Sequence, residues 1–298
     1  MDVFIWFFII IGLLLLGYLT ICLIAALTLT KVGPHPQYES DPGAFGVTFE
    51  HVNFLSRMDK LQVAAWYLPN PVAEKAIILV HGRNASKQNA ISGKLSELAS
   101  EITNAGLAVL MIDLRAHGDS EGKRYMWGVK ERWDVLGAVD FLLEKGFARG
   151  NIAVLGISLG GAAVIGAASQ EDAIGAVIIE STFADLQTLI DPNWKSESGL
   201  PSLFLPGVYW IWQVRFGINL REIKPVREIV KIRQRPILIL HSLSDETVDI
   251  SHAYQLEAAA PESKFVIFTN CEHAELFRDQ PGIYLDALLP FLSKTWQV

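Results

Sequence analysis

Six short, continuously apolar runs alternate with amphipathic stretches between residues 76 and 268 of this 298-residue chain. Parallel strands that helices cover on both faces are unbroken hydrophobic runs of this kind. Between the runs, apolar residues such as Val129, Trp133 and Leu136 recur at helical spacing. The pattern predicts an α/β fold with a mostly parallel, doubly wound sheet. The runs are Ala76–Val80, Leu107–Ile112, Ile152–Leu155, Ile174–Ile179, Pro236–Leu240 and Phe265–Phe268.

Two further regions flank or interrupt this alternation. Val47–Phe54 and Leu61–Leu68 are strand-like and are separated by polar residues, which predicts an antiparallel entry hairpin. Between Ser181 and Val230, about 50 residues rich in aromatics and prolines pass without a strand. A structureless loop of that length is improbable inside a compact domain, so we interpret residues of about 183–228 as a helical cap, with a wrongly assigned element as the alternative.

The N-terminus carries an uncharged apolar run from Val3 to Leu29. A helix of this run would reach roughly 40 Å, more than the ~30 Å hydrocarbon layer of a bilayer. We therefore predict a single-pass membrane anchor over residues 1–30, a linker over 31–44 and one α/β domain over 45–298, with the cap inserted in it. A cleaved signal peptide is the competing hypothesis, but acidic Asp2 and the length of the run disfavour it. Only Lys31 flanks the run closely, so the side of the membrane stays open.

Charge and cysteine content limit the partners and cofactors. The chain holds 25 Lys and Arg and 32 Asp and Glu residues, without basic blocks, which argues against nucleic acid as a partner. Cys22 lies inside the apolar run and Cys271 lies near the C-terminus, so neither a disulfide framework nor a zinc motif is expected. Protein partners and oligomeric state cannot be inferred from the sequence.

A G-x-S-x-G pentapeptide, Gly156–Gly160, follows the apolar run Ile152–Leu155 and precedes a small-residue helical stretch. This is the arrangement of a nucleophile elbow, in which a serine stands on a sharp strand-to-helix turn. Gly156 and Gly160 are needed because side chains there would collide with the neighbouring strand and helix. The pentapeptide predicts Ser158 as a nucleophile.

A serine nucleophile needs a base, an acid that orients the base, and donors for the oxyanion. The chain supplies an acid and a histidine in the order Ser, Asp, His. Asp245 follows the strand-like run Pro236–His241, and His273 follows Lys264–Phe268. Asp245 could instead be a solvated or helix-capping aspartate, and Glu246 or Glu180 could take its place as the acid.

Two backbone N–H groups should form the oxyanion hole. We predict that Leu159, directly after the nucleophile, donates one of them, and that Arg83 donates the other from the loop after an earlier strand. Gly82 allows that loop to turn close to the substrate. The Arg83 side chain either meets a substrate anion or points into solvent.

Charged and glycine residues also follow the strands that end near His81 and Asp113. Asp113, His117 and His81 are interpreted as a network that holds these loops beside the site, and His241 is given the same role.

These motifs together resemble the α/β-hydrolase superfamily, and in particular its serine aminopeptidase-like and monoacylglycerol-lipase-like group with membrane-anchored members. The resemblance spans about residues 45–295. It implies an eight-stranded sheet, a triad of Ser158, Asp245 and His273, and an acyl-enzyme mechanism without metal or cofactor. The motifs are His81-Gly82, Asp113-x-Arg115-x-His117-Gly118-x-Ser120, Gly156-x-Ser158-x-Gly160-Gly161, Asp245 and His273.

Two positions depart from the pattern of that group. Ser242 stands where glycine often follows the strand histidine, and Ala116 stands in a loop that frequently carries glycine. Neither change removes a member of the triad.

The sequence thus predicts a membrane-anchored serine esterase or lipase-like hydrolase that acts on a small-molecule or lipid acyl substrate. The aromatic cap and the anchor favour a lipid ester or thioester. A serine peptidase or amidase on the same triad is the first alternative, with charged cap residues such as Asp185, Asp191 or Arg215 holding a peptide terminus. A non-catalytic membrane-bound scaffold with a hydrolase fold is the second.

Overall fold

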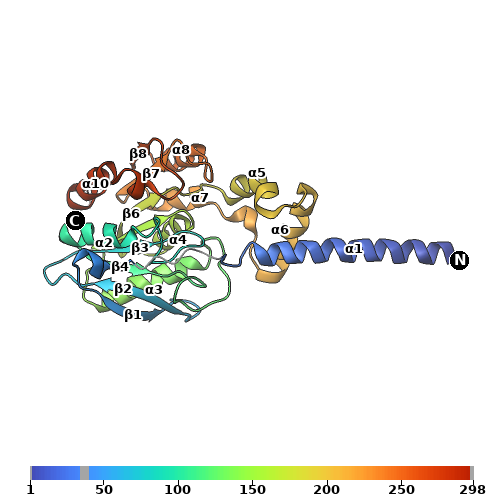
Figure 1. The fold of residues 1–298 in the computed structure, drawn as a ribbon, viewed down its shortest axis with the longest axis horizontal. Coiled ribbons are helices and arrows are strands. Elements are labelled where there is room, and N and C mark those ends of the chain that lie inside the picture. The colour runs from blue at the N-terminus through green and yellow to red at the C-terminus, as the bar shows by residue number, and fades with distance from the viewer. Residues whose placement is uncertain (1, 34–39, 296–298) are drawn as a thin grey trace. The chain divides into compact units, whose positions relative to one another are not determined.

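The computed structural model of the chain describes residues 2–33 and 40–295. Residues 34–39 of the expected linker and 296–298 of the expected catalytic domain lie outside these ranges. Eight strands form a single sheet in the order β1-β2-β4-β3-β5-β6-β7-β8 (Figure 1). The strands are β1 (Glu50–Leu55), β2 (Gln62–Leu68), β3 (Ala76–Val80), β4 (Ala108–Ile112), β5 (Ile152–Ile157), β6 (Ile174–Glu180), β7 (Ile237–Ser242) and β8 (Lys264–Phe268).

The predicted mostly parallel sheet is confirmed. β1 and β2 form the entry hairpin, with Glu50 opposite Tyr67 in antiparallel register. β2 also pairs antiparallel with β4, whereas the pairings among β3 to β8 are all parallel. The carboxyl ends of β3, β5, β6, β7 and β8 therefore lie along the same edge of the sheet, where ligands bind in folds of this type.

Helices cover the sheet on both faces, which explains why its inner strands are continuously apolar (Figure 1). Ile77 and Leu79 of β3 share one apolar core with α2 and α10. Ile78 and Val80 point to the opposite face and are also fully buried. On that face α3 packs against α4. The elements outside the sheet are α2 (Leu95–Asn104), α3 (Glu131–Glu144), α4 (Leu159–Ala168), α7 (Pro225–Ile229), α8 (Ile250–Ala259), α9 (Leu276–Asp279), α10 (Pro281–Pro290), the 3₁₀ turns η1 (Pro42–Phe45) and η4 (Val230–Ile232), and a π-helical turn η5 (Phe291–Thr295).

The chain divides into two compact units. We call residues up to Lys31 together with Asp185–Lys224 the helical unit, and the remaining chain the sheet unit. The strandless segment is helical, as expected. The helical unit contains α1 (Asp2–Thr28), α5 (Leu186–Ser198), η2 (Ser202–Phe204), α6 (Leu205–Phe216) and η3 (Leu220–Glu222).

Within the helical unit, the C-terminal part of α1 packs against η2 and α6. The Tyr18 ring stacks on Phe204 with centroids 5.2 Å apart, and the Trp212 indole N–H donates to the Ala26 carbonyl oxygen at 3.1 Å. A Cβ at Gly207 would lie 2.5 Å from the Cys22 sulfur. The absence of a side chain at this position therefore allows the two helices to approach closely.

Candidate active site

Ser158 stands on the turn between β5 and α4, with φ of +53° and ψ of −112°. Such a conformation is rare for a residue with a side chain and stores strain of about 1–3 kcal/mol. Its N–H donates to the Glu180 carbonyl oxygen at 2.8 Å, which ties the turn to β6. A Cβ at Gly156 would overlap the Gly160 carbonyl, and one at Gly160 would lie 2.5 Å from the His81 carbonyl oxygen. The close packing around this turn requires both glycines.

His273 lies on the loop after β8 and points toward Ser158. Its Nε2 is 3.0 Å from Ser158 Oγ, and its Nδ1 is 2.8 Å from Oδ2 and 3.0 Å from Oδ1 of Asp245. Because Nδ1–H donates to the carboxylate, Nε2 is left to accept the serine hydroxyl proton. The fold therefore joins three residues from separate strand ends into one hydrogen-bonded chain.

The Asp245 side chain is fully buried at the carboxyl end of β7. Its Oδ1 also accepts the N–H groups of Thr247 at 3.0 Å and Val248 at 2.8 Å. Burial alone would raise the pKa of Asp245, but the hydrogen bond and charge of His273 and the N–H of Val248 hold this pKa below its ordinary value. The same carboxylate thus organises its own loop, as a capping aspartate would, and orients His273.

The two fallback acids lie elsewhere. Glu246 is exposed. Glu180 is fully buried, and its carboxylate accepts the Tyr284 hydroxyl at 2.8 Å and the Leu276 N–H at 3.4 Å, at the start of α9. Burial raises the pKa of Glu180 to about 7. Glu180 therefore supports the segment that follows His273 and does not contact its imidazole in the place of Asp245.

Two serines hold the loop that carries His273. The Ser242 hydroxyl donates to the Cys271 carbonyl oxygen at 2.8 Å, and the Ser181 hydroxyl oxygen accepts the Ala274 N–H at 3.3 Å. Ser181 has a φ of +49° directly after β6. The sequence reasoning missed Ser181, although its place at a strand end is the signal that could have found it.

The segments predicted to form the oxyanion hole lie next to Ser158. Leu159 is the first residue of α4, so the positive end of that helix starts beside the nucleophile candidate. A Cβ at Gly82 would lie 3.4 Å from Ser158 Cβ, which shows how closely the loop after β3 approaches. The Arg83 guanidinium lies over the Trp127 ring, 5.4 Å from its centroid.

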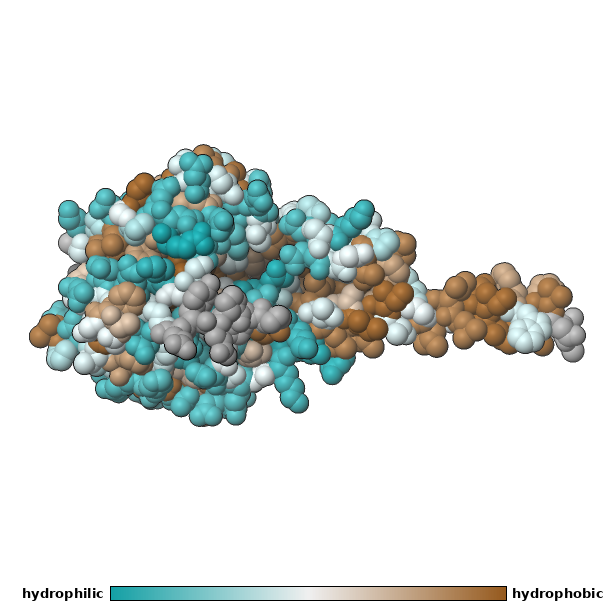
Figure 2. Space-filling view, viewed as in Figure 1, coloured by the Kyte–Doolittle hydropathy of each residue, from teal (hydrophilic) through white to brown (hydrophobic). Residues whose placement is uncertain are grey.

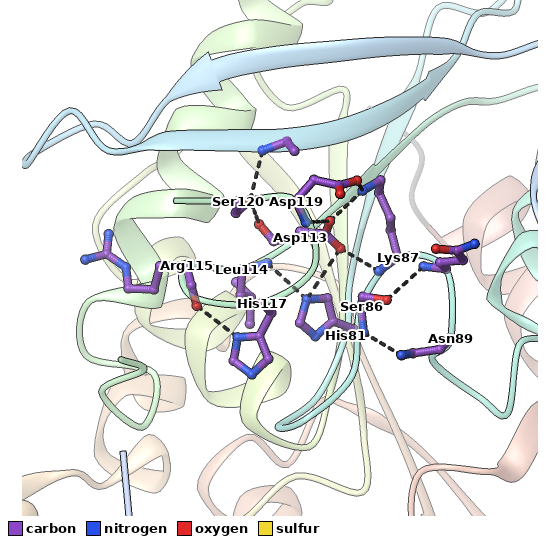
Figure 3. Close-up of polar contacts among 12 residues, drawn as sticks. His81, Ser86, Lys87, Asn89, Asp113, Leu114, Arg115, His117, Asp119 and Ser120 are labelled. Carbon is purple, nitrogen blue, oxygen red and sulfur yellow. Dashed lines mark hydrogen bonds and ion pairs between the residues drawn. The ribbon is translucent and has the colours of Figure 1, made fainter. Parts of the chain in front are cut away.

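A buried ion pair joins the loops after β3 and β4 (Figure 3). Lys87 Nζ donates to Asp113 at 2.5 Å and to Asp119 at 2.7 Å, while the Lys87 N–H donates to Asp113 at 2.7 Å. The Lys87 side chain is only 3% exposed and that of Asp113 is fully buried. Sequence reasoning missed Lys87 because a loop lysine is normally solvated, and only the tertiary structure supplies its two carboxylates.

Two histidines complete this network (Figure 3). His81 Nε2 accepts the Leu114 N–H at 3.0 Å, and its Nδ1–H donates to the Gly82 carbonyl oxygen at 2.7 Å. His117 Nε2 accepts the Asn84 N–H at 3.3 Å. These contacts place both histidines between the loops after β3 and β4. The two histidines thus bond to Gly82 and Asn84, the residues on either side of Arg83.

Comparison with known proteins places this architecture in a family. A family described as serine aminopeptidase, S33, matches residues 71–231, which is more than half of the chain. The chain belongs to this family. Among relatives of this S33 chain, the uncharacterized protein YqkD of Bacillus subtilis is 30% identical over 221 residues, covering 73% of this chain and 70% of YqkD. The uncharacterized protein YfhR of Salmonella typhimurium is 25% identical over 297 residues, covering 92% and 93%.

The fold of this S33 family member is the α/β-hydrolase fold. The structure of the Pyrococcus furiosus esterase Pf2001 superposes with a TM-score of 0.73 at 20% identity, over 89% of this chain and 98% of that one. The two departures from the family pattern now have a structural description. Ser242 uses its hydroxyl to hold the His273 loop, whereas Ala116 adopts a φ of +64°, a conformation that glycine reaches without steric cost.

Proposed function

We propose that this protein is a serine hydrolase that cleaves a carboxylic ester or a related acyl bond. The observation that carries the proposal is the hydrogen-bonded chain from Ser158 Oγ through His273 to Asp245, with distances of 3.0 Å and 2.8 Å. A serine hydroxyl at this distance from an oriented imidazole is an activated nucleophile.

The reaction follows from this geometry. His273 Nε2 takes the Ser158 hydroxyl proton as Oγ attacks the acyl carbonyl carbon, and Asp245 stabilises the resulting imidazolium. N–H groups of Leu159 and Arg83 stabilise the oxyanion. The imidazolium then protonates the leaving alcohol or thiol, which leaves Ser158 acylated. A water molecule, deprotonated by His273, then attacks the acyl carbonyl carbon, and the imidazolium returns the proton to Ser158 Oγ as the acyl–Oγ bond breaks and the acid leaves.

A lipid ester or thioester is the favoured substrate class. The apolar N-terminal helix and the aromatic residues of the helical unit support an apolar acyl chain. The name of the structurally similar Pyrococcus protein, an esterase, supports ester chemistry.

We also propose that α1 is a retained membrane anchor and not a cleaved signal sequence. It is the candidate span of the described residues, and composition and length alone fit both hypotheses. The anchor is favoured because Cys22 and Ala26 are fully buried and Trp212 bonds to the Ala26 carbonyl. Cleavage beyond these residues would remove the packing partner of α6.

Peptidase activity is the second candidate, and the family description, serine aminopeptidase, favours it. An aminopeptidase needs an acid that binds the substrate amine. Two of the acids considered for this role are already engaged within the helical unit, since Asp185 binds Lys224 at 2.5 Å and Asp191 accepts the Tyr209 hydroxyl. Ester hydrolysis is therefore preferred.

Labelling of the membrane fraction with a fluorophosphonate probe tests the proposal. Wild type and the control Ser169→Ala should label, whereas Ser158→Ala and His273→Ala should not. Labelling of Ser158→Ala would assign the nucleophile to another residue, and a folded but unlabelled wild type would favour the scaffold hypothesis. Hydrolysis of nitrophenyl esters of graded chain length, compared with aminoacyl nitroanilides, then separates esterase from peptidase.

A further inference from the structure

We propose that helix α6 lies in the surface of the lipid bilayer, so that the helical unit contacts lipid through a second element besides α1. This inference rests on the proposed anchoring by α1 and extends it. Three large apolar side chains on η2 and α6 point into solvent. Leu203 is 60% exposed, Trp210 is 55% exposed and Val214 is 67% exposed.

The length of α1 places its contacts with α6 at membrane depth. A hydrocarbon layer of ~30 Å needs about 20 helical residues. Asp2 is charged and lies outside the apolar run, so a span of that length starting at Val3 reaches Cys22. The part of α1 in which every residue is exposed, residues 3–17, would cover only about 22 Å. Residues from Tyr18 onward must therefore complete the span.

These residues of α1, from Tyr18 onward, are also the ones that contact η2 and α6. The Tyr18 hydroxyl donates to the Leu203 carbonyl oxygen at 3.0 Å, and its ring stacks on Phe204. The Cys22 thiol lies 3.6 Å from the Phe204 carbonyl oxygen, close to Gly207. If Tyr18 and Cys22 lie in the last turns of the span, η2 and the start of α6 lie at the boundary between acyl chains and headgroups.

The exposed face of α6 carries residue types that are common in proteins at the boundary between acyl chains and headgroups. Pro206, Trp210 and Val214 follow one another at intervals of four residues and share one side of the helix. Tryptophan is enriched where the bilayer meets water. Arg215, in the last turn, is exposed and can extend its guanidinium to lipid phosphates.

Lipid is the occupant that fits this face because the face continues an apolar surface of the same unit. Leu23 and Ile24 of α1 remain exposed beside the segment that contacts α6. Figure 2 shows the hydrophobic surface of α1 running into the adjoining surface of the helical unit. A lone apolar patch would fit a second copy of the chain equally well, but a patch joined to a membrane span lies where lipid is already present.

Site-specific fluorescence in nanodiscs tests the proposal on the full-length chain. An environment-sensitive dye is attached at Trp210→Cys or Val214→Cys. Leu13→Cys in α1 is the control inside the bilayer, and Ser196→Cys on α5 is the control in water. Wild type gives the background, since Cys22 and Cys271 are both buried. Quenching by lipids that carry a nitroxide either near the headgroup, for positions 210 and 214, or in the middle of the acyl chain, for position 13, is compared with quenching by iodide.

We expect lipid quenching at positions 210 and 214 to exceed that at 196 by at least threefold, with iodide quenching reduced to match. If position 13 is quenched by lipid while 210 and 214 behave like 196, the anchor stands and the inference fails. If position 13 itself is reached by iodide, the anchoring proposal fails and the inference fails with it. If positions 210 and 214 are shielded from both quenchers, a protein covers them, which also overturns the inference.

Discussion

Individual side chains decide the chemistry of Asp245 and His273. Asp245 accepts three N–H groups, those of His273, Thr247 and Val248, which explains why a buried carboxyl keeps its charge. Ser242, which stands where glycine is common, donates its hydroxyl to the Cys271 carbonyl oxygen and so holds the loop that carries His273. The position of His273 therefore depends on residues that never touch Ser158.

Replacing Asp245 with Asn should separate its effect on the orientation of His273 from its effect on the folding of its own loop. We expect Asp245→Asn to fold, because the amide oxygen still accepts the two loop N–H groups. Ester turnover should fall roughly 1,000- to 10,000-fold, because the amide no longer holds His273 in the productive tautomer. Steady-state kinetics and circular dichroism measure the two effects. A loss of less than tenfold would show that the histidine is oriented by another group.

Glu180 should give the protein a distinctive dependence of stability on pH. The pKa of Glu180 is about 7 in the folded state, above its ordinary value of 4.5. Between these values the folded state keeps a proton that the unfolded state has lost, so this group lowers stability as pH rises through the window. Glu180→Gln should remove this effect, because the amide is neutral and its oxygen can still accept the Tyr284 hydroxyl.

Urea denaturation of wild type and Glu180→Gln from pH 4.5 to 8 measures this difference. The unfolding free energy of the variant, relative to wild type, should rise by up to about 3 kcal/mol across the range. The exposed control Glu246→Gln should run parallel to wild type. Parallel curves for all three proteins would contradict a raised pKa of Glu180.

At the scale of elements, glycines mark where segments approach each other closely. Gly82 brings the loop after β3 against Ser158, and Gly207 brings α6 against α1. The first approach belongs to the candidate site. The second belongs to the helical unit, where it joins residues more than 180 positions apart.

Gly207→Leu should separate α6 from α1, because a side chain at this position would overlap Cys22 and Tyr18. Overpacking of this kind costs about 1–3 kcal/mol. We expect faster hydrogen exchange in peptides from α6 and η2, measured by mass spectrometry in nanodiscs. Gly17→Leu on the exposed side of α1, where a Cβ meets nothing within 4 Å, is the matched control. Equal exchange in both variants would show that the helix contact does not stabilise α6.

At the scale of the whole molecule, the apolar N-terminus and the strandless insertion form one compact unit although the sheet unit separates them in sequence. If α1 were cleaved as a signal sequence, residues 185–224 would therefore lose part of the compact unit to which they belong. The two hypotheses differ in the mass of the mature protein.

We expect the protein recovered from membranes to keep α1, because α6 and η2 pack on it. Intact-mass spectrometry of the full-length chain, expressed with a C-terminal tag, should show the complete N-terminal helix. The protein should also stay in the membrane after alkaline carbonate washing. A species shortened by about 25–30 residues would favour the signal peptide.

The periodicity of the sequence predicted the strands well because a strand that is buried on both faces consists of consecutive apolar residues. Ala76–Val80 is an example, since its bounds match β3. The order of Ser158, Asp245 and His273 indicated the candidate site for a similar reason, since each follows a strand. No comparable pattern in the neighbouring sequence indicates the roles of Lys87 and Ser181. Their importance comes from partners on other strand ends, which local sequence does not specify.

The sequence by itself determined the α/β architecture, the strained turn at Ser158 and the length of the apolar helix, because each depends on residues that are neighbours in the chain. Only the tertiary structure decided that Asp245 contacts His273 where Glu180 and Glu246 do not. It also decided that Lys87 is buried between two aspartates and that α1 packs against α6. These contacts join residues far apart in the chain, and hydrogen-bond geometry and close packing select them only once the strands and helices have assembled.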